Sequence, residues 1–198
     1  DKADSLRWVR RTSGDKHVIL STSAGMVIRF EETQIRAMGR STRGVKGINI
    51  KPQDNLTSMA IIEPSDDKLQ LLIVTKKGYG KNLKLNEFRC QKRGGIGVKC
   101  LKFRKTIKND FVTDALITTK EDEIMLVTKE GVLCRQKIAN ISTQRRQSQG
   151  VKIQKLDEKD EVIAMARVIS ETEAALQAEE EAKLEESVVK PIEPILPL

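Results

Sequence analysis

Short runs of apolar and β-branched residues alternate with polar turns along most of the chain. Three of these runs end in a threonine that stands three residues before a glycine, and another apolar run follows the glycine. Strand, glycine-containing turn and strand is the pattern of a β-hairpin. The expected first strands are His17–Thr22, Leu69–Thr75 and Glu123–Thr128, and their partners are Met26–Phe30, Tyr79–Leu83 and Val132–Gln136.

The hairpins belong to an internal repeat of 53 residues. A Gly-Val-Lys triplet begins at Gly44, Gly97 and Gly150, and the glycine of each hairpin turn stands 19 residues earlier. A third strand is expected after each triplet, and a fourth after a turn that carries an aspartate. The third strands are Val45–Ile50, Val98–Phe103 and Val151–Leu156, and the fourth are Leu56–Ile62, Phe111–Ile117 and Val162–Ile169. The turn aspartates are Asp54, Asp110 and Asp160, of which Asp110 stands three residues further from its turn glycine than the others.

Four short strands per repeat of about 50 residues are typical of a propeller blade, which buries its apolar face only against its neighbours. The fold class predicted is therefore all-β and propeller-like. We expect blades over residues 16–63, 68–118 and 121–169. Residues 1–15, with an apolar segment at Leu6–Arg10, would be the end of a preceding blade. Residues 170–198 read as an acidic tail, partly helical or disordered.

The charge of the chain divides between these parts. The net charge is +8, but residues 169–198 hold eight acidic and two basic residues. The remaining body has 34 basic and 20 acidic residues, a net charge of +14. A compact body this basic attracts polyanions, of which nucleic acid is the commonest and an anionic membrane surface the second. No apolar run reaches the roughly 20 residues that a membrane helix needs, so no membrane partner is expected.

The residues that could carry catalysis or bind a metal form no recognisable constellation. The three cysteines contain no Cys-x-x-Cys pair, and His17 is the one histidine. We therefore expect no metal site, no disulfide framework and a reducing, intracellular location. Tyr79 lies in the turn Gly78-Tyr79-Gly80 without a neighbouring base, and no catalytic residue is expected.

Basic residues recur at one place in every repeat. An arginine stands four residues before the triplet glycine each time, at Arg40, Arg93 and Arg146, and a lysine ends each triplet. Small residues in these loops let the backbone approach a phosphate, and arginine offers forked donors to its oxygens. Aromatic residues do not interleave with the charges, so contacts to a duplex backbone fit better than base stacking on single strands. The candidate DNA-binding residues are Arg36, Arg40, Arg43, Lys46, Arg89, Gln91, Lys92, Arg93, Lys99, Arg145, Arg146 and Lys152.

One of these loops resembles a known motif. The heptad Gln91-Lys92-Arg93-Gly94-Gly95-Ile96-Gly97 is similar to the gyrase A box, the hallmark of the C-terminal DNA-wrapping domain of the DNA gyrase A subunit. The segments Gly25–Phe30, Gly39–Val45, Gly78–Lys81 and Asp122–Leu126 resemble blade repeats of that family. Ile96 stands where the box usually has a basic residue, and the heptad lies in the middle copy. We therefore interpret the three copies as the last blades of the family's disc.

The resemblance implies a β-pinwheel, in which each blade exchanges a strand with its neighbour and a basic perimeter wraps double-stranded DNA. It also implies membership of a type II topoisomerase that supercoils DNA in an A2B2 complex of A and B subunits. ATP and Mg²⁺ would serve that holoenzyme, whereas this segment would need no cofactor and would itself be non-catalytic. The location would be the bacterial cytoplasm, or a plastid. Two alternatives remain open: the C-terminal domain of the topoisomerase IV A subunit, and a β-propeller scaffold that binds proteins.

Overall fold

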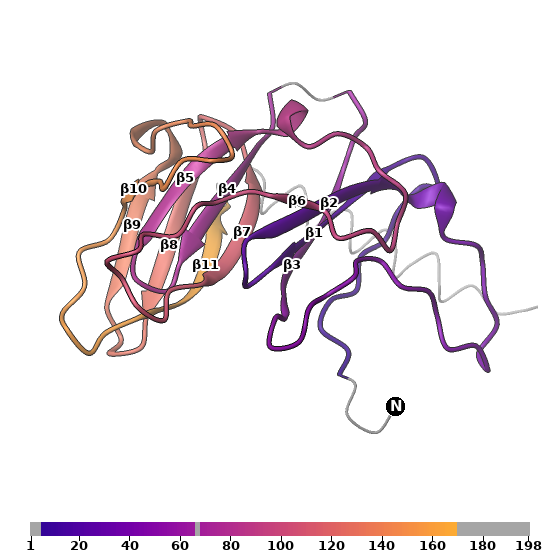
Figure 1. Ribbon diagram of the computed structural model, residues 1–198. Helices are drawn as coiled ribbons and strands as arrows, with labels where there is room; N and C mark the ends of the chain where they lie inside the picture. The colour runs from indigo at the N-terminus through magenta and orange to yellow at the C-terminus, as the bar shows by residue number, and fades with distance from the viewer. Residues whose placement is uncertain (1–4, 66–67, 170–198) are drawn as a thin grey trace, which may run out of the picture. The chain divides into compact units, whose positions relative to one another are not determined.

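The computed structural model describes residues 5–65 and 68–169, which are all-β (Figure 1). Short 3-10 turns η1 (Glu32–Gln34), η2 (Leu85–Glu87) and η3 (Ile138–Asn140) follow three of the strands. In this part of the chain no helix is long and apolar enough to cross a membrane. The strands are β1 (His17–Thr22), β2 (Met26–Glu31), β3 (Leu56–Ile62), β4 (Gln70–Thr75), β5 (Tyr79–Lys84), β6 (Val98–Lys99), β7 (Val112–Thr118), β8 (Glu123–Thr128), β9 (Leu133–Lys137), β10 (Val151–Lys152) and β11 (Val162–Val168).

The chain divides into two compact units, Asp1–Arg167 and Val168–Leu198. The blades lie in the first unit, apart from the last residue of β11. The acidic tail expected over residues 170–198 lies outside the described residues.

The strands form three antiparallel sheets, one for each repeat. Their orders are β3-β1-β2-β6, β10-β5-β4-β7 and β11-β8-β9. Strand β6 comes from the second repeat but completes the sheet of the first, with Val98 opposite Val27. Strand β10 of the third repeat completes the second sheet in the same way, with Val151 opposite Gly80. The strand exchange that the resemblance implied is therefore present between successive blades.

The nine expected hairpin and fourth strands are all formed, with ends that differ by one residue at most. The third strands are shorter than expected. Only Val98–Lys99 and Val151–Lys152 pair, because Lys99 and Lys152 already face Met26 and Tyr79, the first residues of β2 and β5. Beyond them each segment meets the hairpin turn, where Cys100 donates to the Gly25 carbonyl and Ile153 to the Gly78 carbonyl. The expected strand at Val45–Ile50 is wrong, and the apolar segment Leu6–Arg10 forms no strand either. The described residues before β1 contain no hairpin of a preceding repeat, whose edge could receive such a strand.

The hairpin turns explain why threonine, glycine and aspartate recur. In each turn the glycine amide donates to the threonine carbonyl, as Gly25 does to Thr22 at 2.9 Å. The glycine has a positive φ, which a three-residue hairpin loop requires at that position. The turn aspartate accepts from the amide just before that glycine: Asp54 from Ala24, Asp110 from Lys77 and Asp160 from Glu130. Asp110 reaches the same place despite its three-residue shift in the sequence.

Two of the three hydrophobic cores in the described residues lie between blades, and the third lies within the first repeat. Strand β4 is buried along its whole length because both of its faces are covered. Leu71 and Ile73 pack with Ile19 and Val27 of the first blade, whereas Leu72 and Val74 pack with residues of the third blade. Strand β8 buries only alternate residues. Successive blades thus stack face to face, and this stacking brings the loops of the second and third repeats beside the preceding blade.

Candidate nucleic-acid interface

The loop that carries the box-like heptad is docked on the first blade through Arg93. The Arg93 amide donates to Gln34 Oε1 at 2.8 Å, and its Nε donates to the Gln34 carbonyl at 2.9 Å. Its Nη1 donates to the Lys46 carbonyl at 3.1 Å. The Gly94 amide also donates to the Gly47 carbonyl, at 2.6 Å. Residues of the second repeat therefore lie directly against the Gly-Val-Lys segment of the first, so Lys46, Lys92 and Arg93 form one basic cluster.

The same arrangement recurs 53 residues later. The Arg146 amide donates to Glu87 Oε2 at 3.0 Å, and Nη1 donates to the Lys99 carbonyl at 3.3 Å. Glu87 takes the place of Gln34, and its carboxylate also lies 3.8 Å from Arg146 Nε. Lys99, Arg145 and Arg146 thus form a second basic cluster on the second blade.

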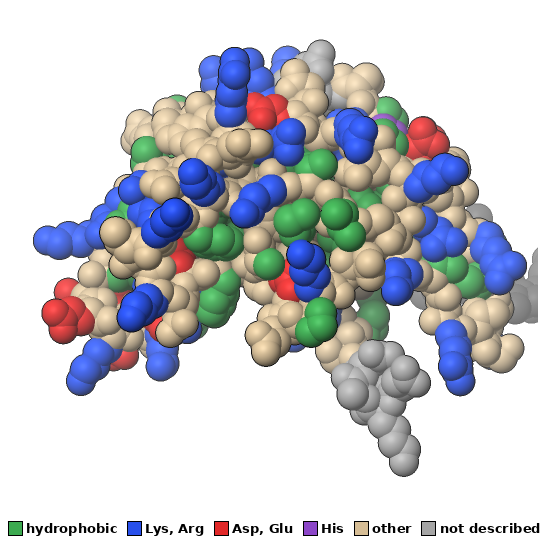
Figure 2. Space-filling view, viewed as in Figure 1, with side chains coloured by type: hydrophobic (Ala, Val, Ile, Leu, Met, Phe, Trp, Pro, Cys, Tyr) green, Lys and Arg blue, Asp and Glu red, His purple; other side chains and the backbone are tan. Residues whose placement is uncertain are grey.

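Most of the twelve candidate residues project into solvent. Arg36, Arg40, Arg43, Lys46, Arg89, Lys92, Lys99, Arg145 and Lys152 are exposed, whereas Gln91, Arg93 and Arg146 are half-buried. Figure 2 shows Lys and Arg side chains spread over one face of the protein, with acidic side chains in only a few places. Exposed cations at recurring positions suit contacts with phosphates, which fix a duplex without reading its sequence.

The first repeat differs from the other two. Arg40 is exposed, and the described residues give it no hydrogen bond or ion pair. The sequence pattern treats Arg40, Arg93 and Arg146 as equivalent, but only the last two dock on a preceding blade. The residues on which they dock, Gln34 and Glu87, stand at equivalent positions but differ in charge. The search for recurring charges in the sequence therefore did not identify them.

A third basic cluster surrounds Tyr79. The Arg104 guanidinium lies 4.5 Å from the centre of the Tyr79 ring, and Lys152 Nζ lies 5.4 Å from it. Arg104 also donates to the Gly150 carbonyl at 2.9 Å. Both cations can interact with the π-system of the ring. Tyr79 thus holds two basic side chains, and Arg104 joins the candidate residues although it stands outside the repeated pattern.

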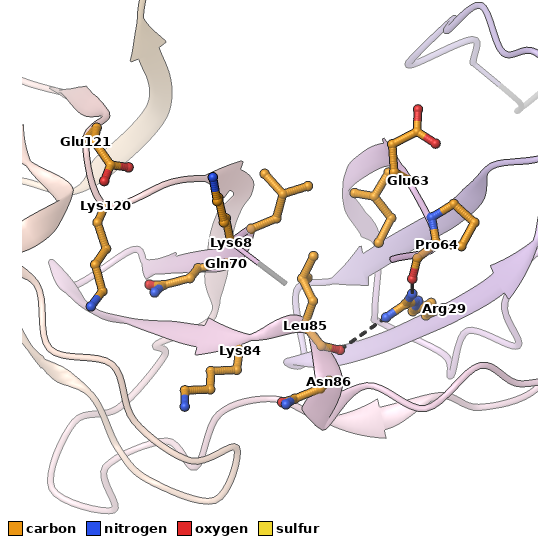
Figure 3. Close-up of a pocket in the computed structure, with 12 residues that line it drawn as sticks. Arg29, Glu63, Pro64, Lys68, Gln70, Lys84, Leu85, Asn86, Lys120 and Glu121 are labelled. Atoms are coloured by element: carbon orange, nitrogen blue, oxygen red, sulfur yellow. Dashed lines mark hydrogen bonds between the residues drawn. The ribbon is translucent and has the colours of Figure 1, made fainter. Parts of the chain in front are cut away.

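A cavity of about 680 Å³ lies beside the ends of β2, β3 and β5 (Figure 3). Lysine and glutamate side chains line it together, including Lys84, Lys120 and Glu63. Arg29 is held there by two carbonyls: Nη2 donates to Pro64 at 2.8 Å and Nη1 to Leu85 at 3.4 Å. The described residues that line the cavity place no nucleophile beside a base.

The topology also brings together His17, Glu31 and Cys90, whose possible ligand atoms lie within 4.8 Å of one another. The sequence spacing did not predict this group. His17 Nδ1 accepts a hydrogen bond from Arg29 Nε at 2.9 Å. Burial, and then the Arg29 charge, lower the pKa of His17. The neutral ring therefore carries its proton on Nε2, and neither ring nitrogen offers a free lone pair to a metal in this arrangement.

Comparison with known proteins agrees with this geometry. The family model of the DNA gyrase C-terminal domain, a β-propeller, matches residues 16–63, 70–119 and 122–169. The DNA gyrase A subunit of Synechocystis sp. is 35% identical over an alignment that covers 84% of this chain and 23% of the relative. The A subunit of Kosmotoga olearia gyrase is 38% identical over 162 residues, or 82% of this chain and 20% of the relative. The chain thus spans about a fifth to a quarter of the length of these curated relatives.

Solved structures show the same fold. The C-terminal domain of DNA topoisomerase IV superposes with a TM-score of 0.76 at 26% identity, covering 85% of this chain and 52% of that one. The ParC C-terminal domain of E. coli has a TM-score of 0.60 at 15% identity, covering 79% of this chain and 64% of that one. The family match extends over most of the chain and over all three blades. The chain therefore belongs to the family of DNA gyrase C-terminal domains.

Proposed function

We propose that this chain binds and wraps double-stranded DNA as the C-terminal part of a DNA gyrase A subunit. The observation that carries the proposal is the recurrence of a docked basic loop on successive blades. The Arg93 loop beside Lys46 and the Arg146 loop beside Lys99 use equivalent contacts 53 residues apart. Repeated cations along a stack of blades can follow a curved duplex, which a single patch cannot.

The segment acts by holding DNA, and the chemistry of strand passage belongs to other parts of the enzyme. In the proposed assembly, it works with the rest of its own polypeptide and with the gyrase B subunit in an A2B2 holoenzyme. That holoenzyme uses ATP and Mg²⁺ and acts in the bacterial cytoplasm or a plastid. The candidate residues bind phosphates and orient the duplex, and none of them acts in catalysis.

A duplex-binding titration at several salt concentrations tests the proposal. If about six phosphates are neutralised, log K should fall against log salt with a slope near −5, from roughly −0.9 per phosphate. Duplexes of unrelated sequence should bind with similar affinity. A slope near zero, or a strong preference for one sequence, contradicts the wrapping function.

The second candidate is the C-terminal part of a topoisomerase IV A subunit. The superposition on the topoisomerase IV domain favours it, and so does Ile96, which stands where the gyrase box usually has a basic residue. The gyrase relatives and the remaining six residues of the heptad favour gyrase. Both candidates bind duplex DNA through the same residues, and they differ in how far the duplex is bent.

A further inference from the structure

A lysine is buried directly beneath the loop that carries Arg145 and Arg146. Lys81 lies on β5 and is 0% exposed. Its ammonium donates to the carbonyls of Arg145, Arg146 and Ser148 at 2.8, 2.9 and 3.0 Å, and lies 2.9 Å from Ser148 Oγ. Three donors thus face four oxygens, all from one loop of the following repeat.

Such a site is costly unless every donor is satisfied, because a buried ammonium loses its hydration. Burial lowers the pKa of Lys81 to about 8, so the group still carries its charge at neutral pH. The groups that face it are Glu87 from η2, Arg146 from the loop and Cys100 after β6. Burial raises the pKa of the Cys100 thiol to about 12, which keeps it neutral. The oxygen cage therefore supplies the hydrogen-bond acceptors of the ammonium, and Glu87 supplies an acidic group nearby.

The first blade provides an internal comparison. Ile28 stands where the second blade has Lys81, and Gly95 stands where it has Ser148. A Cβ on Gly95 would lie 3.6 Å from Ile28 Cδ1, so the two positions also face each other there. On the first blade, the loop of the following repeat therefore packs Gly95 against the Ile28 side chain. On the second blade, the equivalent loop instead places three carbonyls and a hydroxyl around the Lys81 ammonium.

We propose that Lys81 is a positioning residue for DNA binding, which draws the carbonyls of Arg145, Arg146 and Ser148 inward and so fixes Arg145 and Arg146 at the surface. The inference rests on the proposed function and assigns Lys81 a part in it. A carbonyl oxygen turned outward would oppose a phosphate, whereas a carbonyl held by Lys81 cannot. Lys81 touches no DNA itself and acts through the loop.

The test compares Lys81→Met with Lys84→Met, which removes a charge from an exposed position on the same strand. Amide hydrogen exchange at residues 145–150 should accelerate in Lys81→Met and stay unchanged in Lys84→Met. Duplex affinity should fall about tenfold in Lys81→Met, the size expected when buried acceptors lose their partner, and less than about twofold in Lys84→Met.

A double-mutant cycle separates positioning from general destabilisation. Arg145→Ala should cost less affinity in the Lys81→Met background than in the unchanged chain, while Arg36→Ala, in the first repeat, should cost the same in both. The variant Lys81→Ile with Ser148→Gly introduces the residues that Ile28 and Gly95 provide at the first blade. Its duplex affinity should lie within about threefold of that of the unchanged chain. It also carries the test if Lys81→Met fails to fold.

Unchanged hydrogen exchange and affinity in folded Lys81→Met, or additive effects of Lys81→Met and Arg145→Ala, overturn the inference while leaving the proposed function standing. A chain with intact Lys81 that shows no salt-dependent duplex binding overturns the proposed function. The hydrogen-exchange result then still reports whether Lys81 holds the loop.

Discussion

At the scale of single residues, the arginines of the repeat differ in what holds them. Arg93 gives two of its side-chain donors to carbonyls of the preceding blade and is half-buried. Arg40 is exposed and has no such partner among the described residues. A half-buried guanidinium of this kind can hold the loop in place and at the same time offer its remaining donors to a phosphate.

Substituting these two arginines should separate the two roles. Arg40→Ala should leave the free energy of unfolding within about 0.5 kcal/mol, because an exposed side chain adds little to stability. Arg93→Ala should lower it by roughly 1–2 kcal/mol, since two carbonyls lose their partner. Both should weaken duplex binding and make its salt slope shallower by about 0.9 for each phosphate that is no longer neutralised. Urea unfolding and DNA titration of the same samples measure both effects, and equal stability of the two variants contradicts the docking role.

At the scale of elements, close approach of two backbones decides where the exchanged strands can form. Gly97 and Gly150 precede β6 and β10, and both have a φ of +72°. A Cβ on Gly97 would lie 2.6 Å from the Val27 carbonyl oxygen, and one on Gly150 would lie 2.6 Å from that of Gly80. Gly44 has nearly the same φ, +75°, but nothing lies within 4 Å of its Cβ position.

The three glycines therefore form a matched set. Gly44→Ala should cost about 1 kcal/mol, the strain of a positive φ alone. Gly97→Ala and Gly150→Ala should cost about 2–4 kcal/mol, because a backbone clash is added to that strain. Thermal unfolding of the three variants gives the comparison. Equal losses of stability in all three variants would mean that the positive φ alone requires glycine at these positions, and that the close approach of the exchanged strand does not.

The sequence was sufficient for the hairpins because their signal is local. Thr22 and Gly25 lie within one turn, and Asp54 lies at a nearly constant distance, so periodicity alone locates them. The short pairing of Val98–Lys99 could not be predicted from residue type, because it depends on an edge presented by another repeat. The burial of Lys81 could not be predicted for a related reason. A lysine is normally exposed, and the oxygens that surround this one come from residues more than 60 positions away in the sequence.

The same limit applies to the candidate site. Recurrence identified the loops around Arg93 and Arg146, but it could not show that each docks on the preceding repeat. It also implied that Arg40 would be held as they are. Arg104 has no counterpart in the pattern, and only the stacking of blades brings it over Tyr79.

At the scale of the whole molecule, opposite charges occupy opposite parts of the sequence. Residues 1–168 carry a net charge of +14, and residues 169–198 carry a net charge of −6. Covalent attachment makes any encounter between the two parts intramolecular, which raises the effective concentration of the acidic residues. Carboxylates and phosphates are both anions that arginine binds, so the acidic segment can compete with DNA for the same cations.

Removing residues 171–198 should therefore tighten duplex binding, most strongly at low salt, because a competing anion is lost. The gain should shrink as salt screens both interactions, since the Debye length falls from about 30 Å at 0.01 M to about 10 Å at 0.1 M. Titration of a labelled duplex into the full and shortened chains at two salt concentrations measures the difference. A matched control replaces Glu179, Glu180 and Glu181 by Gln, which keeps the length and removes three charges, and should give part of the gain. Identical curves for all three proteins at low salt would mean that the acidic residues leave the basic loops free, and that DNA affinity is set by the blades alone.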